Sequence, residues 1–220
     1  MRALMTALAL LCALGCIAPD SAAQSNAAVP AGANDALNRI TGQIAQYAVI
    51  RAEFVQTKQM AAMKRPLVTS GTIVFSRGDG VLWRIEQPYR VSYVLGENRI
   101  VEIGADGARR ERGMREVAGL AQIGRVFRAL LGADAAALRD YFEVEVRGDP
   151  GKWEIDLKPR DAQLAQFLTG LRLSGGRFVD GIRIGEAGGD STEIRFRNTQ
   201  GAAVPDENEL RLFGPVPVKR

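Results

Sequence analysis

The sequence predicts a mainly β fold of the α+β class: an antiparallel sheet or barrel of about ten strands, with a helix at the N-terminus and a helix pair midway. Short segments in which apolar and polar residues alternate recur at a spacing of roughly ten residues, with glycine-rich turns between them. Midway along the chain, residues 117–141 follow the period of a helix instead. A sheet this wide is expected to curl.

The segment 71–88 predicts a β-hairpin more clearly than any other. Gly78-Asp79-Gly80 supplies turn residues, and Pro88 ends the second strand because it has no N–H for a ladder. Arg77 closes a face that is otherwise apolar. The apolar positions of that face alternate along both strands: Ile73 and Phe75, then Val81, Trp83 and Ile85.

Around this hairpin, the N-terminal half predicts one helix and three further strands. Apolar residues at spacings of three and four predict a helix over 35–48, with Asn34 or Asp35 as its cap. The arginine-rich stretch 108–115 is interpreted as a solvated loop. Alternation predicts strands over 50–60, 89–95 and 99–103.

The C-terminal half predicts the helix pair and then strands to the end. Helices are predicted over 117–132 and 134–141, the second capped by Asp134. A helix pair inserted midway through a run of strands must lie across the sheet or close one end. Strands are predicted over 142–147, 153–158, 164–173, 178–184, 191–198 and 209–213.

The N-terminus predicts export. Arg2 precedes an apolar run, and Ser21-Ala22-Ala23 is a small-residue cleavage site before Gln24. The apolar run is too short for a permanent membrane span. The predicted organisation is a cleaved signal peptide over 1–23, a flexible tether over 24–33 and a single domain over 34–220.

The two cysteines also bear on how the exported chain is processed. Cys12 and Cys16 both lie before the cleavage site, so the cleaved chain has no thiol and depends on its core instead of on disulfides. Alternatively, residues 13–16 resemble a lipoprotein signal, in which Cys16 would be lipidated. If Gln24 is the first residue of the exported protein, the soluble form is favoured.

The composition excludes most enzyme chemistry. The chain has no histidine, which is the commonest general base near neutral pH and a frequent metal ligand. We therefore expect no catalytic residue, no metal and no cofactor. A net charge of +4 without aromatic-interleaved lysine runs gives no reason to expect a nucleic-acid partner. A carboxylate-dependent hydrolase is the enzyme alternative, but its candidate acids alternate with apolar residues, as on the wet face of strands: Glu143, Glu145, Glu154 and Asp156.

The predicted concave face is rich in aromatic residues, namely Phe75, Trp83, Tyr93 and Trp153. With an amphipathic helix pair over it, this face could form a solid core or a lidded apolar cavity. Composition is compatible with both.

From about Asn34 to Phe213 the sequence resembles the LolA family of periplasmic outer-membrane lipoprotein carriers. One matching motif is Phe54-x-Gln56 on the first strand. In the family hairpin an arginine is followed by a tryptophan six residues later and a proline five after that, and here these are Arg77, Trp83 and Pro88. A weaker match is Leu157-Lys158-Pro159 before a strand that contains Phe167.

This resemblance implies an unclosed antiparallel β-barrel whose helices form a lid over an apolar cavity. It also implies a periplasmic monomer that carries lipoproteins from an inner-membrane exporter to an outer-membrane acceptor. Arg77 would hold the closed lid through hydrogen bonds to lid carbonyls. The cavity and lid residues it implies are Phe75, Arg77, Trp83, Ile85, Tyr93, Leu120, Ile123, Phe127, Leu130 and Trp153.

One departure from the family leaves other interpretations open. The segment 101–118 lacks the tryptophan-containing strand usual in the family and has the arginine cluster instead. The cargo could therefore be another lipid, such as a glycolipid whose anionic head group meets these arginines. An outer-membrane-anchored lipoprotein receptor with a lipidated Cys16 and a module that senses lipoproteins are further alternatives.

Overall fold

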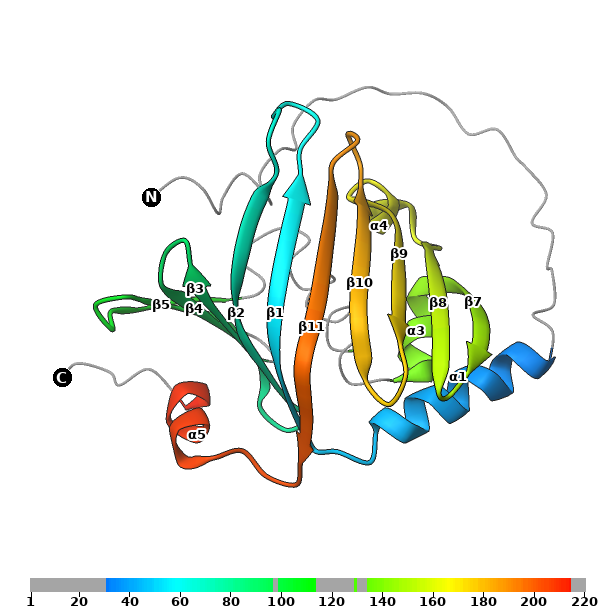
Figure 1. Ribbon diagram of the computed structural model, residues 1–220, viewed down its shortest axis with the longest axis horizontal. Helices are drawn as coiled ribbons and strands as arrows, with labels where there is room; N and C mark the ends of the chain where they lie inside the picture. The colour runs from blue at the N-terminus through cyan, green and yellow to red at the C-terminus, as the bar shows by residue number, and fades with distance from the viewer. Residues whose placement is uncertain (1–30, 97–98, 114–128, 130–133, 215–220) are drawn as a thin grey trace.

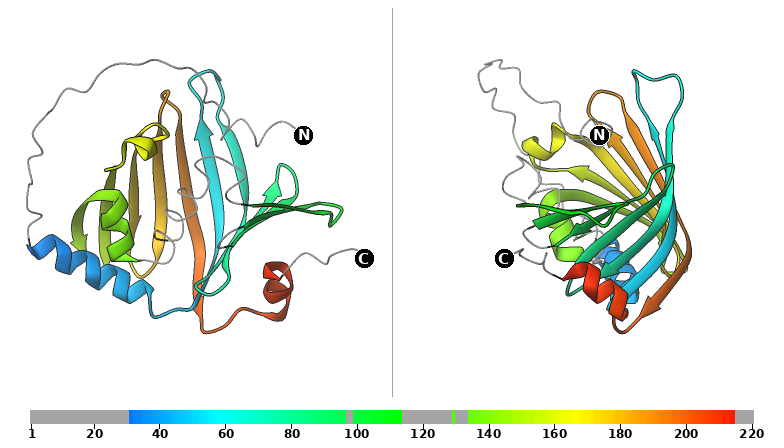
Figure 2. Two further views of the ribbon diagram at one scale, coloured as in Figure 1. Left: turned by 180° about the vertical axis from the view of Figure 1, so that it is seen from behind. Right: turned by 90° about the vertical axis from the view of Figure 1, so that its left-hand side faces the viewer.

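The computed structural model describes residues 31–96, 99–113, 129 and 134–214, and they form one wide, curved sheet (Figure 1). Its eleven strands are all antiparallel and lie in the order β6-β5-β4-β3-β2-β1-β11-β10-β9-β8-β7. Among the described residues the edge strands β6 and β7 do not pair, so the barrel is unclosed, as predicted (Figure 2). The strands are β1 (Val49–Gln59), β2 (Leu67–Ser76), β3 (Gly80–Gln87), β4 (Val91–Leu95), β5 (Arg99–Gly104), β6 (Arg109–Gly113), β7 (Phe142–Asp149), β8 (Lys152–Pro159), β9 (Leu168–Gly175), β10 (Val179–Glu186) and β11 (Ser191–Ala202).

The chain fills the sheet as two meanders that meet at its centre. Strands β1 to β6 follow one another outward to one edge, and β7 to β11 run inward from the other edge until β11 pairs with β1. Phe54 of β1 stands at this seam, in register with Phe196 of β11 and Gly71 of β2. Because β6 and β7 are opposite edges, the chain passes from one edge to the other between Gly113 and Phe142.

The concave face carries the larger hydrophobic cluster. Alternate residues of the strands point into it, and helices α1 (Ala31–Ile44), α3 (Ala135–Tyr141) and α4 (Ala162–Ala165) add Leu37, Leu138 and Leu164 (Figure 2). The apolar stripe of α1 is therefore buried, as its spacing predicts. None of the helices in the described ranges is long and apolar enough to cross a membrane.

The helix boundaries follow local hydrogen bonds. Helix α1 begins at Ala31, inside the segment predicted as a tether, and ends at Ile44, earlier than the predicted end at residue 48. The Asp134 carboxylate accepts the N–H groups of Ala136 and Ala137 at 3.1 and 3.0 Å, which confirms the predicted cap of α3.

The outer, convex face is covered beneath the hairpin by α5 (Glu207–Phe213). Val74 of β2, Leu82 of β3 and Phe213 of α5 belong to a second buried cluster on this face. Both faces of the β2–β3 hairpin are therefore buried, whereas the sequence predicts only one dry face.

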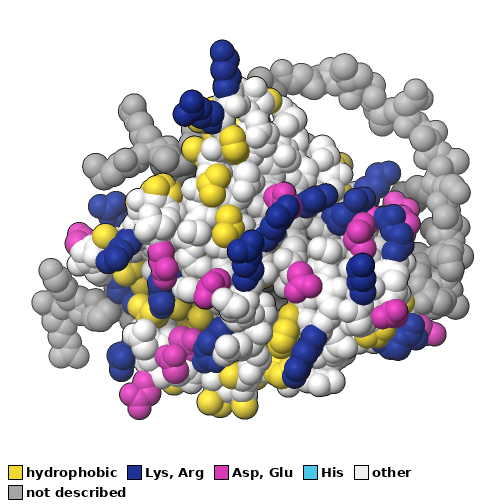
Figure 3. All heavy atoms as spheres, in the orientation of Figure 1, with side chains coloured by type: hydrophobic (Ala, Val, Ile, Leu, Met, Phe, Trp, Pro, Cys, Tyr) yellow, Lys and Arg dark blue, Asp and Glu magenta, His cyan; other side chains and the backbone are white. Residues whose placement is uncertain are grey.

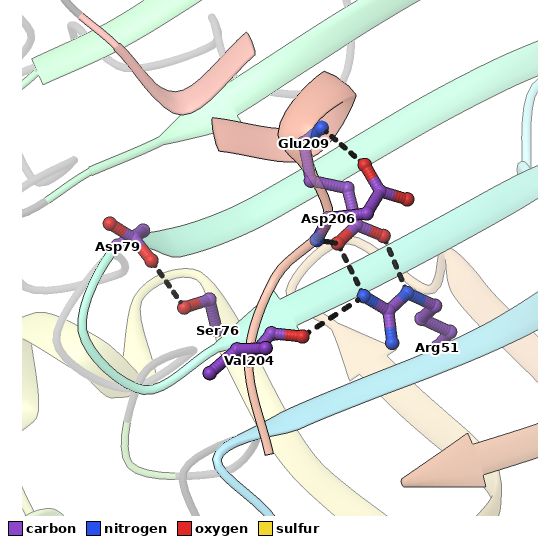
Figure 4. A network of polar contacts seen from close by, with 6 residues as sticks. All are labelled: Arg51, Ser76, Asp79, Val204, Asp206 and Glu209. Carbon is purple, nitrogen blue, oxygen red and sulfur yellow. Dashed lines mark hydrogen bonds and ion pairs between the residues drawn. The ribbon is translucent and has the colours of Figure 1, made fainter. Parts of the chain in front are cut away.

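An ion pair holds α5 to the sheet (Figure 4). Arg51 of β1 donates from Nε and Nη2 to the two carboxylate oxygens of Glu209 at 2.6 and 2.5 Å. Asp206 caps the helix by accepting the Glu209 N–H at 2.8 Å, and Glu209 accepts the Asp206 N–H in return. These contacts raise the pKa of Arg51, chiefly through its hydrogen bond with Glu209.

Two predicted elements are wrong because local signals outweigh alternation. Residues 209–213 form a helix, not a strand, since the Asp206–Glu209 capping box starts a helix and places Glu209 and Phe213 on its buried side. Residues 164–173 are only partly strand: Asp161 caps the short helix α4, and β9 begins at Leu168.

The structure of the arginine-rich stretch also differs from the one predicted. Residues 109–113 form the edge strand β6, not a solvated loop. An edge strand does not need an apolar face. One register pair of β5 and β6 has opposite charges, Glu102 and Arg110, and the Arg99 guanidinium lies 4.0 Å from the Glu111 carboxylate.

Candidate functional site

The hairpin residues expected at the site line the concave face together. Phe75 and Ile85 are buried in the concave cluster, and Trp83 is partly buried against it. The Trp83 ring lies 4.3 Å from the Phe54 ring, centroid to centroid. Glycine is required opposite Phe54, because a Cβ on Gly71 would stand 1.9 Å from the Arg84 carbonyl oxygen.

Tyr93 continues this surface on the next strand. It is in register with Trp83 on one side and with Glu102 on the other, and it is partly buried against the concave cluster. Burial raises the pKa of its phenol, and the charge of Glu102 adds to the effect. A neutral phenol and a carboxylate are thus the polar groups at this end of the apolar face.

Trp153 belongs to the same cluster but has a structural anchor. Its Nε1–H donates to the Gly176 carbonyl at 2.7 Å, and the side chain of Gln43 on α1 donates to the same oxygen at 2.9 Å. A Cβ on Gly175 would lie 2.6 Å from the indole ring. Gln43 therefore ties α1 to the turn between β9 and β10, and Trp153 donates to the same carbonyl of that turn.

Arg77 lies at the end of the hairpin beside the end of α1. Its Nη2 donates to the carbonyls of Ala45 and Tyr47 at 2.7 and 3.2 Å, and its backbone N–H donates to Ala48 at 2.9 Å. The guanidinium is exposed. Arg77 thus donates to carbonyls of the turn that follows α1, whereas the resemblance implies carbonyls of a lid.

The remaining expected lid residues, Leu120, Ile123, Phe127 and Leu130, lie outside the described residues. Within that predicted helix the structure describes Ala129 alone. Ala129 is helical and buried in the concave cluster, and its carbonyl accepts the Asp134 N–H at 3.0 Å. This places one residue of the predicted helix against the concave face.

Sequence reasoning missed two features of this face. Phe54 and Phe196 join the cluster at the central seam, and only strand order could have placed them together. Three polar side chains also lie together at one end of the concave face. Lys58 Nζ pairs with the Glu186 carboxylate at 2.7 Å, and the Thr192 hydroxyl donates to the same carboxylate at 2.8 Å. The described ranges hold no cluster of acids that could bind a metal ion.

The candidate hydrolase acids do not gather into a site. Asp156 lies between Arg147 and Arg172, and Glu154 also pairs with Arg172, at 3.1 Å. Glu145 lies 3.7 Å from Arg147. They form a charge ladder on the convex face of β7–β9.

The described chain thus forms an unclosed antiparallel sheet with helices packed on its apolar concave face. The sequence matches the family model of outer membrane lipoprotein carrier protein LolA-like proteins over residues 27–204, and the chain belongs to this family. A comparison with curated proteins finds no match.

Solved structures of similar shape are distant in sequence. The complex of MucA and MucB from Pseudomonas aeruginosa is 17% identical with a TM-score of 0.48, and the match covers 82% of this chain and 60% of that chain. A LolA superfamily protein from Nitrosomonas europaea is 7% identical with a TM-score of 0.46, covering 81% and 96%. Lipoprotein LppX from Mycobacterium tuberculosis is 8% identical with a TM-score of 0.44, covering 81% and 100%.

Proposed function

We propose that the protein binds the acyl chains of lipoproteins on its concave face and carries them through the periplasm from an inner-membrane exporter to an outer-membrane acceptor. The observation that carries this proposal is an apolar concave face that runs across the sheet and ends in the partly buried rings of Trp83 and Tyr93. Membership of the LolA-like family supports the same function.

The energetics suit reversible carriage. Each acyl methylene removed from water contributes about 0.8 kcal/mol, so burial of about eight methylenes contributes roughly 6 kcal/mol. That corresponds to about a 10⁴-fold preference for the bound state, enough for capture yet weak enough for transfer. Uptake and release by burial need no covalent step, which agrees with a chain that contains no histidine.

Arg109, one member of the arginine cluster, is directed away from the concave face, whereas Arg110 is in register with Glu102. Arg109 donates to the carbonyls of Leu212 and Gly214 at 3.0 and 3.1 Å, on the α5 side of the sheet. It therefore stabilises the C-terminal helix, and its donors are not directed at a cargo on the concave face.

A charge placed on the concave face tests the proposal. Val91 is partly buried against the concave cluster, and Val91→Glu would confront an acyl chain with a carboxylate. We expect affinity for a fluorescent fatty acid, and for a diacylated lipopeptide competing with it, to fall at least roughly tenfold.

Val204→Glu is the matched control, because Val204 is 69% exposed and lies outside both clusters. Circular dichroism establishes that both variants are folded. Equal affinities of the two variants, or an unaltered protein that takes up neither ligand, would contradict acyl binding on this face.

A further inference from the structure

The tip of the β1–β2 hairpin exposes apolar side chains beside two cations. The exposed large hydrophobic residues of the described chain number seven, and three of them belong to this tip. We name the tip surface by its residues: Met63 (42% exposed), Leu67 (43%) and Val68 (52%), with exposed Lys64 and Arg65. Figure 3 shows hydrophobic side chains gathered below basic ones at the top of the molecule.

The tip projects beyond the neighbouring strand. Strand β2 begins at Leu67, but its register with β3 starts only at Ser70, opposite Gln87. Val68 pairs with Thr57 and Leu67 with Lys58, so the two apolar side chains point to opposite faces of the hairpin. Exposed apolar side chains therefore lie on both faces of the tip. A flat protein surface in contact with one face would leave the other face exposed.

Backbone hydrogen bonds fix the shape of the tip. The Met63 N–H donates to the Met60 carbonyl at 2.9 Å, and the Ala61 N–H donates to the Asp190 carboxylate at 2.9 Å. The tip is thus braced against the β10–β11 turn. Its apolar side chains are presented by a formed hairpin, so their exposure does not come from local unfolding.

Several cations elsewhere on the convex face are paired with acids. Arg147 and Arg172 on that face pair with Asp156, and Arg195 pairs with Glu193 at 2.9 Å. By contrast, Lys64 and Arg65 have no ion-pair partner within the described ranges. Two unneutralised cations beside exposed apolar side chains complement a surface that is anionic outside and apolar beneath.

We propose that the tip surface docks the protein on an anionic phospholipid bilayer. Met63, Leu67 and Val68 enter the boundary between head groups and acyl chains, and Lys64 and Arg65 meet the lipid phosphates. The inference goes beyond the proposed function, because it concerns the outer end of the hairpin and not the concave face.

Vesicle flotation tests the proposal with the exported protein, after mass spectrometry has excluded an acyl chain on Cys16. Protein docked on a vesicle floats with it, whereas protein that has only extracted a lipid stays in solution. We expect flotation with phosphatidylglycerol vesicles, weaker flotation with pure phosphatidylcholine vesicles, and a decrease with added salt. Each of two variants, Met63→Ser/Val68→Ser and Lys64→Glu/Arg65→Glu, should lower the affinity for the anionic vesicles by roughly tenfold or more.

The control for charge is Arg39→Glu/Lys152→Glu, which makes the same change at two exposed residues, one on α1 and one at the start of β8. It should float as the unaltered protein does, and both tip variants should still take up fatty acid. If the unaltered protein does not float, or if the tip variants float as well as the control, docking by the tip is overturned. Either result leaves acyl binding on the concave face to its own test.

Discussion

At the scale of single residues, Arg77 is the polar side chain that joins the hairpin to the end of α1. The carbonyls of Ala45 and Tyr47, which accept its hydrogen bonds, lie in the turn that follows α1 directly after Ile44. A guanidinium suits the position because it donates to two carbonyls and its charge complements the helix C-terminus.

We predict that Arg77→Leu folds but releases cargo faster than the unaltered protein. Loss of two hydrogen bonds at an exposed site should cost about 0.5–1.5 kcal/mol per bond at most, which lowers the midpoint of thermal unfolding by a few degrees. Release is faster because the end of α1, whose body packs on the concave cluster, loses its tie to the hairpin. Transfer of a fluorescent acyl cargo to acceptor vesicles measures the rate.

Arg90→Leu is the control for this substitution, since Arg90 is exposed and the structure gives it no hydrogen bond. A release rate for Arg77→Leu that equals that of Arg90→Leu would refute a latch at Arg77.

The sequence could identify Arg77 as an unusual residue, but it could not identify its partners. Alternation places Arg77 on the same face of the hairpin as Phe75 and Ile85. The structure buries Phe75 and Ile85 in the concave cluster. The carbonyls that accept its hydrogen bonds belong to residues 32 and 30 positions earlier in the chain. Such contacts depend on how α1 enters the sheet, and periodicity carries no information on that.

At the scale of elements, α5 shows how a short helix with two alternating leucines can pass for a strand. Leu210 and Leu212 suggest a period of two, yet the residues that face the sheet are Glu209 and Phe213, one helical turn apart. The available signal was the Asp-x-x-Glu capping box at Asp206–Glu209. The edge strand β6 is the opposite case, since it pairs with β5 although its sequence has no alternating apolar face.

We predict that Glu209→Ala destabilises the protein by about 1.5–3 kcal/mol, because the charge-assisted hydrogen bonds with Arg51 and the bond from the Asp206 N–H to the Glu209 carboxylate are lost. Glu209 is only 4% exposed, so water does not replace these bonds fully. Urea unfolding followed by tryptophan fluorescence measures the change.

Glu207→Ala on the same helix is the control, because the Glu207 side chain is 95% exposed and lies 4.0 Å from Arg211. It should change stability by less than about 0.5 kcal/mol. If both substitutions have equal effects, the ion pair with Arg51 does not hold α5 to the sheet.

At the scale of the whole molecule, the fold class and the unclosed barrel could be predicted, but the seam could not. Alternation predicts which residues share a face of the sheet. The family resemblance predicts that the barrel does not close. The pairing of β1 with β11 brings together residues about 140 positions apart, such as Phe54 and Phe196, and no local pattern specifies it. The central floor of the concave face was therefore beyond sequence reasoning.

The central claim is that this face holds an acyl chain, and native mass spectrometry of the protein purified after export tests it most directly. The account predicts a bound species heavier than the polypeptide by the mass of an acylated molecule. Collisional activation should release that molecule, and fragmentation should identify it as the lipid-modified N-terminus of a lipoprotein. A spectrum of the bare polypeptide alone, unchanged after incubation with a diacylated lipopeptide, would contradict the account.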